Sequence, residues 1–186
     1  MAATASLVAE RGYHQVGVDE IGAAAGVSGA AIYRHFSGKQ ELLVVVIERA
    51  VDALMGEARR IVAESPSAHE ALTALIGAHV DFAMTETALI TVYDQEAHNL
   101  DEAPRRRLRR QQRAYTELWI DVLERLAPGR SRDELSVAVH GAFGLLNSVA
   151  DHRRRLPDAE CAALLFDMAR GSLAAVTSLG GTQTVT

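Results

Sequence analysis

The stretch IGAAAGVSGAAIYRHFSGK, residues 21–39, decides which fold the sequence of this 186-residue chain predicts. Just before it and in its first part, Val18, Ile21 and Ala25 recur at i, i+3 and i+7, which is the spacing of one apolar helix face. Gly26 follows, where a tight turn needs a residue that adopts positive φ without strain. The stretch therefore begins with a short amphipathic helix that ends in a glycine turn.

A second short helix follows the turn and divides its residues between two faces. Ser28 is a good N-cap, because its hydroxyl can accept a hydrogen bond from a free backbone N–H group. Ile32 and Phe36, at i and i+4, face inward. The residues left for the outer face are Gly29, Ala30, Ala31, Tyr33, Arg34 and His35. A short helix, a glycine turn and a helix with small residues at its tip have the shape that enters a DNA major groove.

The segment GVSGAAIYRHFSGKQELL, residues 26–43, resembles the helix-turn-helix of the TetR family of transcriptional regulators. The upstream segment ASLVAERGYHQVGVDEIG, residues 5–22, resembles the family's first helix and linker. The resemblance covers residues 1–55, and beyond them only the number and order of helices match. The DNA-contacting positions that it implies are Ser28, Gly29, Ala30, Ala31, Tyr33, Arg34, His35 and Lys39. Lys39 opens the next helix, where its ammonium and the first backbone amides favour a phosphate.

The outer face of the second helix limits how it reads bases. Residues 29–31 have no polar side chain, so they can offer only methyl contacts with thymine, backbone contacts or close approach. Sequence specificity then rests on Tyr33, Arg34, His35 and the local shape of the DNA. An alternative for Arg34 is a surface ion pair with Glu41, which would remove it from the DNA contacts.

The composition favours an all-α protein of the cytoplasm. Hydrophobic residues make up 48% of the chain and only four prolines interrupt it, which suits a mostly helical fold with a buried core. No apolar run approaches the roughly 20 residues that span a bilayer, and no signal segment opens the chain. The single cysteine, Cys161, excludes an internal disulfide and fits a reducing compartment. We therefore expect no membrane partner.

The charge balance argues against the DNA-binding interpretation. The net charge is −5, and residues 1–50 carry four basic and five acidic side chains, whereas a nucleic-acid-binding module usually has a basic surface. The resemblance implies a further half-helix and a basic arm before the position of Met1. We expect the chain to begin inside the first helix, which would account for the missing positive charge.

Apolar residues at helical spacing predict six further helices after the head. Their expected ranges are 39–64, 67–84, 87–99, 101–126, 132–151 and 158–179. The expected domains are a helix-turn-helix DNA-binding head at residues 1–45 and a helical ligand-binding and dimerisation body at residues 46–186. The first of the six helices belongs to both domains, and we expect it to act as a rigid connection between them.

The last two expected helices carry small residues among large apolar ones, which allows close helix packing. The stripes are Ala138, Gly141, Leu145 and Ser148 in one helix and Leu164, Met168, Gly171 and Ala175 in the other. One interpretation is an ordinary core within the chain. The other, which resembles the TetR homodimer, is an interface built from two helices of each protomer. A two-fold dimer suits a palindromic operator on double-stranded DNA.

Apolar side chains with a few polar groups among them predict a small-molecule pocket in the body. The candidates are Met55, His79, Phe82, Tyr93, Trp119, Phe143 and Asn147. Each of them, taken alone, fits an ordinary core position better than a ligand contact. The arginine-rich run between Pro104 and Arg113 is either a solvated helix face or, as in some relatives, a site for the phosphates of a fatty-acyl-CoA-like effector.

No arrangement of residues predicts catalysis or a bound metal. Asp94, Glu96 and His98 alternate along a helix, so that successive members lie about 200° apart and cannot converge. No H-E-x-x-H spacing, Gly-x-Ser-x-Gly turn or P-loop is present in the sequence. We therefore expect no enzyme activity, no metal and no cofactor.

The sequence thus predicts an all-α, homodimeric, ligand-responsive transcriptional repressor that a small apolar effector releases from a palindromic operator. An activator is equally compatible with the residues. The alternative from another class is a helical small-molecule-binding or catalytic protein whose helix-turn-helix is vestigial. The neutral helix tip and the acidic head keep that alternative open, although the helix-turn-helix motif outweighs them.

Overall fold

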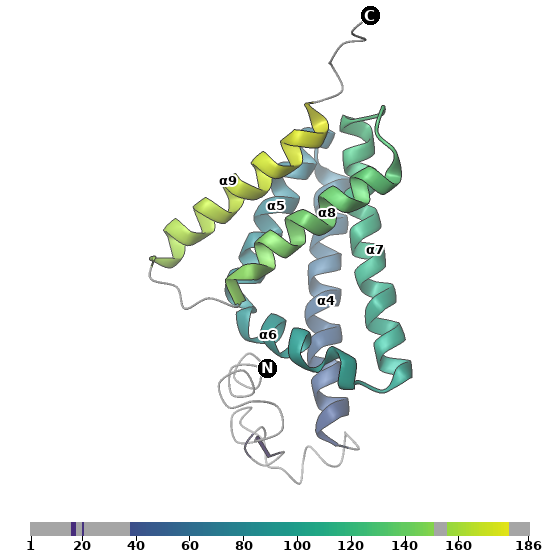
Figure 1. The fold of residues 1–186 in the computed structure, drawn as a ribbon, viewed down its shortest axis with the longest axis vertical. Coiled ribbons are helices and arrows are strands. Elements are labelled where there is room, and N and C mark those ends of the chain that lie inside the picture. Colours follow the sequence, from purple (N-terminus) through teal and green to yellow (C-terminus); the bar gives the residue numbers. More distant parts are fainter. Residues whose placement is uncertain (1–15, 18–19, 21–37, 151–155, 179–186) are drawn as a thin grey trace, which may run out of the picture.

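The structure is a computed structural model that describes residues 16–17, 20, 38–150 and 156–178. Within these ranges the chain forms six α-helices and two short 3₁₀ helices and contains no β-strand (Figure 1). The elements are α4 (Lys39–Glu64), α5 (Ala68–Thr85), α6 (Thr87–Glu96), η2 (Ala97–Asn99), α7 (Glu102–Leu126), α8 (Arg132–Asn147), η3 (Ser148–Ala150) and α9 (Asp158–Thr177). The all-α prediction is confirmed.

The helix boundaries follow from local capping and breaking signals. α4 occupies the predicted range and ends before Ser65 and Pro66, because proline cannot continue a helix. Ser67 caps α5 by accepting a hydrogen bond from a backbone N–H of the first turn at 3.2 Å. At the start of α8, Ser131 and Glu134 form a reciprocal capping box. These signals are local, which is why the sequence predicts the boundaries well.

Two predicted helices differ from expectation in their last turns. The helix expected at residues 87–99 is α6 followed by η2, and the one expected at 132–151 is α8 followed by η3. A 3₁₀ turn is common at a helix end, because its tighter hydrogen bonds satisfy carbonyl groups that an α-helix leaves free. The predicted end at residue 151 lies outside the described residues.

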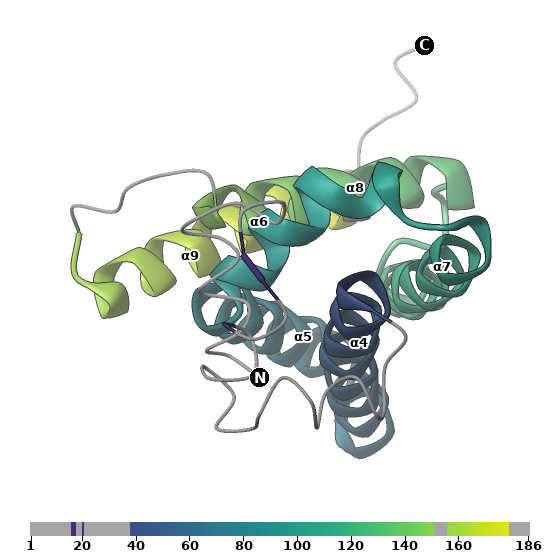
Figure 2. The same ribbon diagram turned by 90° about the horizontal axis from the view of Figure 1, so that it is seen from below.

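The helices pack in two layers. α4, α5 and α7 lie side by side as one layer, and α8 and α9 cross over them as the other (Figures 1 and 2). α8 packs against α7 and α9, and α9 packs against α5. This arrangement places α4, α5, α7 and α8 around a common interior.

Two clusters of buried apolar side chains hold the body together. The larger lies between the layers and includes Leu75, Trp119 and Leu135, each of which is 0% exposed. The smaller joins the first half of α4 to α6 and to the start of α7, through residues such as Leu43 and Leu108. Burying each of these side chains stabilises the fold by about 1.5–3 kcal/mol. α6 and α7 therefore fix the part of α4 that begins the body.

Polar contacts on the surface fasten α7 to α4. Arg107 donates from Nε to Glu48 Oε1 at 2.7 Å, and Gln111 donates from Nε2 to Asp52 Oδ1 at 2.7 Å. An exposed ion pair contributes only about 0.2–1 kcal/mol. These contacts therefore set the relative position of the two helices more than they stabilise the fold.

Among the described residues, no single helix is long and apolar enough to cross a membrane. Only α5 and α6 taken together, with a bend of 80° between them, reach that length and composition. The apolar residues of α5 are buried in the body, among them Leu72, Leu75 and Ile76.

Candidate functional site

A cavity of about 260 Å³ lies between α4, α5, α7 and α8. Its volume is close to the lower end of the range for small-molecule sites, roughly 300–1,000 Å³. Its lining residues are Val51, Leu54, His79, Phe82, Gln112, Tyr115, Thr116, His140, Phe143 and Asn147. The lining combines aliphatic and aromatic walls with a few polar groups, which is the usual character of an effector pocket.

The structure brings together four of the seven predicted pocket residues. His79, Phe82, Phe143 and Asn147 line this cavity. Trp119 does not line it but packs directly behind it, with its ring edge-on to Phe143 at a centroid distance of 5.1 Å and an angle of 88°. The indole is therefore close enough to report on the cavity.

The other two predicted pocket residues lie elsewhere. Met55 is 7% exposed and belongs to the main core, so its side chain does not line the cavity. Tyr93 packs against the smaller core cluster, and its hydroxyl donates a hydrogen bond to Gln112 Oε1 at 3.0 Å. Tyr93 thus contacts Gln112, which lines the cavity, but does not line the cavity itself.

The sequence interpretation did not name six residues that line the cavity. They are Val51, Leu54, Gln112, Tyr115, Thr116 and His140. Helical spacing could have identified one of them, since His140, Phe143 and Asn147 recur at i, i+3 and i+7 on α8. Which residues of α4 and α7 face the cavity depends on the angle at which the helices cross, and no local sequence pattern encodes that angle.

His79 is the central polar group of the cavity. It is 4% exposed, and its Nδ1 lies 3.1 Å from the Tyr115 hydroxyl while its Nε2 lies 3.1 Å from Asn147 Oδ1. Its ring stacks on Phe143 at a centroid distance of 4.7 Å and an interplanar angle of 18°. Burial lowers the pKa of the imidazole from 6.5 to about 4, although the hydrogen bond with Asn147 acts in the opposite direction. The ring is therefore neutral at physiological pH.

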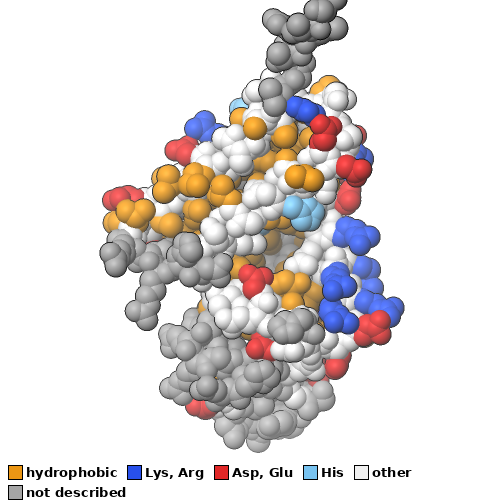
Figure 3. Space-filling model, in the orientation of Figure 1, with side chains coloured by type: hydrophobic (Ala, Val, Ile, Leu, Met, Phe, Trp, Pro, Cys, Tyr) orange, Lys and Arg blue, Asp and Glu red, His pale blue; other side chains and the backbone are white. Residues whose placement is uncertain are grey.

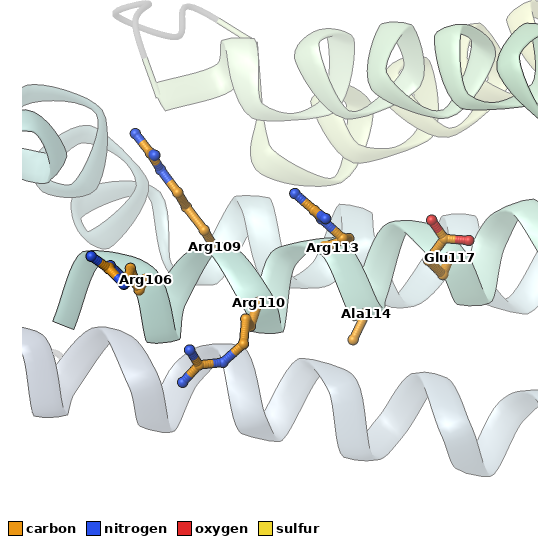
Figure 4. Close-up of a pocket in the computed structure, with 6 residues that line it drawn as sticks. All are labelled: Arg106, Arg109, Arg110, Arg113, Ala114 and Glu117. Carbon is orange, nitrogen blue, oxygen red and sulfur yellow. The ribbon is translucent and has the colours of Figure 1, made fainter. Parts of the chain in front are cut away.

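A basic face of α7 borders the cavity. Hydrophobic side chains gather over α8 and α9, whereas Lys and Arg side chains gather along α7 (Figure 3). Arg109 and Arg113 extend to the same side of α7, and Arg110 points to the opposite side (Figure 4). Arg106 pairs with Glu102. Among the described residues, no carboxylate forms an ion pair with Arg109, Arg110 or Arg113.

A groove between α7 and α8 connects this basic face to the cavity. The groove has a volume of about 470 Å³ and is lined by Arg109, Gln112, Arg113, Thr116, Glu117, Ser136 and His140. Gln112, Thr116 and His140 also line the cavity, so they form its rim. The arrangement can hold a molecule with an apolar part inside and an anionic part outside.

The predicted DNA-contacting residues are not described by the structure, apart from the backbone of Lys39. Ser28, Gly29, Ala30, Ala31, Tyr33, Arg34 and His35 lie outside the described residues. α4 begins at Lys39 without a side-chain cap. An uncapped helix start leaves backbone N–H groups available to an anion such as a DNA phosphate.

The described residues contain no group of three or more His, Cys, Asp or Glu side chains that could hold a metal ion. Cys161 is partly buried and free.

Comparison with known protein families gives two matches. The model described as "Bacterial regulatory proteins, tetR family" matches residues 1–46. The model described as "Tetracyclin repressor-like, C-terminal domain" matches residues 65–151.

Two curated regulators illustrate the similarity. The chain is 39% identical to the HTH-type transcriptional activator FasR of Mycolicibacterium smegmatis over 80 residues, 43% of this chain and 36% of FasR. It is 28% identical to the HTH-type transcriptional repressor KstR2 of the same organism over 135 residues, 72% of this chain and 66% of KstR2. The chain thus spans less than two thirds of the length of each of these relatives.

Solved structures show the same fold. The ketosteroid transcriptional regulator KstR2 of Mycobacterium tuberculosis aligns with a TM-score of 0.74 and 22% identity, covering 94% of this chain and 91% of that one. AibR, in a complex with isovaleryl coenzyme A and operator DNA, aligns with a TM-score of 0.73 and 19% identity, covering 90% of this chain and 94% of that one. At these identities the likeness concerns the fold alone.

We expect the folded protein to lose stability as the pH falls from about 6.5 to about 4. The pKa of His79 falls from 6.5 in the unfolded chain to about 4 in the folded protein, so that below pH 6.5 the unfolded state binds a proton that the folded state excludes. The loss approaches about 3 kcal/mol, since one pKa unit corresponds to ~1.4 kcal/mol. Urea unfolding at several pH values measures this.

The substitution His79→Gln should remove this part of the pH dependence. The exposed His69, also on α5, provides the matched control, because His69→Gln keeps the buried imidazole and should keep the wild-type slope. Parallel stability curves for wild type and His79→Gln would show that the imidazole does not act in this way.

Proposed function

Because this chain belongs to the TetR family of bacterial transcriptional regulators, we propose that it is a DNA-binding repressor controlled by a small molecule. A homodimer would place two recognition helices in successive major grooves of a palindromic operator, ~34–36 Å apart. A small apolar effector would enter the cavity and release the DNA. This role places the protein in the cytoplasm, where operator DNA is accessible.

The observation that carries this proposal is the position of the cavity against α4. Val51 and Leu54 of α4 line it, and the same helix begins at Lys39, next to the predicted recognition helix. A ligand that separates α4 from α5 or α7 would therefore move the start of α4 as well. The size of the response depends on the difference between the effector's affinities for the two arrangements.

The groove favours an effector with an anionic end, such as the coenzyme A thioester of a fatty acid. Arg109 and Arg113 lie at the outer end of the groove, and the cavity with its apolar walls lies at the inner end. Guanidinium groups are well suited to phosphate oxygens. The AibR complex with isovaleryl coenzyme A gives a precedent for this ligand class on the same fold.

Exposed apolar residues of α8 and α9 support dimerisation through the last two helices. Val137 is 75% exposed, Leu164 is 51% exposed and Met168 is 49% exposed. Gly141 and Gly171 lie on the same two helices and are also exposed. Exposed large apolar side chains on two helices that pack against each other often mark a protein–protein contact. A second copy of the chain fits it, because two-fold symmetry would pair the same helices from each protomer.

An activator is the second candidate function within the same family. FasR is named an activator and KstR2 a repressor, and both resemble this chain. A helical small-molecule-binding protein with a vestigial helix-turn-helix is the alternative outside the family's usual role. Binding of the purified protein to the DNA upstream of its own gene, measured by gel shift, separates that alternative from both regulators.

We expect Lys39→Ala to weaken binding to operator and non-operator DNA about equally. It should reduce the slope of log affinity against log salt concentration by about one unit, because one phosphate contact is lost. Fluorescence anisotropy with labelled upstream DNA measures both effects. Arg59→Ala, an exposed basic residue near the far end of α4, is the control and should keep the slope. An unchanged slope in Lys39→Ala would argue against a phosphate contact.

We expect Gly141→Arg and Gly171→Arg to give monomers that have lost operator affinity but keep their helical circular dichroism. A Cβ atom built at either glycine meets no atom within 4 Å, so arginine fits the isolated chain but places a charge in the proposed interface. Sedimentation velocity measures the mass. Gly56→Arg, at a position on α4 that is equally open, is the control and should stay dimeric. Dimers of both interface variants would place the contact elsewhere.

We expect a coenzyme A thioester to change the fluorescence of Trp119 saturably and to release DNA over the same concentration range. Arg109→Gln combined with Arg113→Gln should lower the affinity for the thioester roughly tenfold, as expected for the loss of two partly exposed ion pairs. The affinity for the free fatty acid should stay the same. Arg125→Gln, an exposed residue of the same helix, is the control. Release of DNA without any change in Trp119 emission would place the effector site elsewhere.

A further inference from the structure

The hydrogen bonds around His79 have a definite direction, and this direction fixes which polar group the cavity offers to a ligand. Asn147 Oδ1 can only accept, so the proton of the neutral imidazole lies on Nε2 and is donated to that oxygen across 3.1 Å. Nδ1 is then bare and accepts from the Tyr115 hydroxyl, also at 3.1 Å. One imidazole therefore orients both of its neighbours.

The surroundings of Tyr115 are consistent with donation from its hydroxyl to His79. Burial raises the pKa of the Tyr115 phenol, so the hydroxyl keeps the proton that it donates to His79. Trp119 lies beside Tyr115, with ring centroids 6.1 Å apart. Its indole nitrogen can only donate, and it forms no hydrogen bond of standard geometry with the described residues. No group on this side supplies an acceptor that would turn the tyrosine proton away from His79.

The consequence appears at Asn147, the end of the chain of hydrogen bonds. Its Oδ1 accepts from His79 and is therefore turned toward that ring, and its Nδ2 adds two N–H donors. No described residue accepts a hydrogen bond from that nitrogen. Asn147 is partly buried and lines the cavity. The inner part of the cavity thus presents a hydrogen-bond donor.

The rim of the cavity is different. Gln112 Oε1 accepts from Tyr93, which again leaves an amide NH₂ group. Thr116 and His140, however, donate to backbone carbonyls, Thr116 to Gln112 at 3.1 Å and His140 to Ser136 at 2.8 Å. Both keep lone pairs that can accept. The rim therefore offers both donors and acceptors at the mouth of the cavity, whereas Asn147 presents two N–H donors further inside.

We propose that the Asn147 amide nitrogen donates to a carbonyl oxygen of the effector, and that His79 and Tyr115 are the positioning residues that hold the amide in this orientation. The inference rests on the proposed function in taking the cavity as the effector site. It names the recognised group, a ketone, ester or thioester carbonyl. A ligand with a donor or a methylene at the same place leaves the amide unpaired, and a buried polar group without a partner is unfavourable.

The first test reads the imidazole tautomer in the ligand-free protein by long-range ¹H–¹⁵N correlation. We expect His79 to carry its proton on Nε2, with Nδ1 in the unprotonated range. Tyr115→Phe removes the donor to Nδ1 and should produce a mixture of tautomers, which a purely structural role of Tyr115 would not. A proton on Nδ1 in wild type would reverse the chain, turn the Asn147 oxygen to the cavity and overturn the proposal.

The second test compares octanoyl-CoA with S-octyl-CoA, a thioether that differs only in lacking the carbonyl oxygen. Wild type should bind octanoyl-CoA roughly 3- to 10-fold more tightly, as one net hydrogen bond implies. Asn147→Asp keeps the acceptor for His79 but removes both donors, and it should reduce this ratio to about one. Gln95→Glu makes the same amide-to-carboxylate change at an exposed position on α6 and should keep the wild-type ratio.

The outcomes separate this inference from the proposed function. Equal binding of the two compounds by wild type, with release of DNA by both, would overturn the inference and leave the proposed function intact. Retention of the wild-type ratio in Asn147→Asp would overturn it in the same way. If neither compound binds, coenzyme A thioesters are not the effector, and that part of the proposed function is wrong. The tautomer of His79 then still tests the orientation of Asn147.

Discussion

A buried, neutral imidazole connects the two layers of the body. His79 of α5 is hydrogen-bonded to Tyr115 of α7 and Asn147 of α8, so three helices share one chain of polar contacts. A buried polar group that loses its partner costs about 1–3 kcal/mol. A change in helix spacing that breaks one of these contacts is therefore unfavourable by that amount unless a new partner replaces the one that is lost. A ligand in the adjacent cavity would supply such a partner, so the proposed effector site shares its polar groups with a contact that stabilises the fold.

The helices joined by His79 also determine the position of α4. α7 carries Tyr115 at the cavity and, two turns earlier, Arg107, which is paired with Glu48 of α4. Val51 and Leu54 of α4 line the cavity directly. The first half of α4 packs in its own apolar cluster against α6 and α7. α7 thus contacts both the first half of α4 and the cavity, so a displacement of α7 at the cavity would also act on the start of α4.

The sequence predicts the helices better than it predicts the cavity, and the reason is physical. Helix ends depend on neighbours in the chain, such as Ser65 and Pro66 after α4, and the predicted range of α4 is the observed one. Which residues line the cavity depends on how the helices cross. Met55 and Leu54 are adjacent on α4, yet Leu54 lines the cavity while Met55 fills the core. The DNA-contacting residues that the motif predicts, such as Tyr33, lie outside the described residues and stay predictions.

α8 shows how one amphipathic pattern can serve three purposes. Leu135, Val139, Ala142 and Leu146 point into the core and are each 0% exposed. His140, Phe143 and Asn147 follow the adjacent face and line the cavity. Val137 and Gly141 lie on the outer face, where the proposed second protomer would pack. An effector in the cavity and a partner protomer would therefore contact neighbouring faces of the same helix, and the binding of each would bias the position that the other requires.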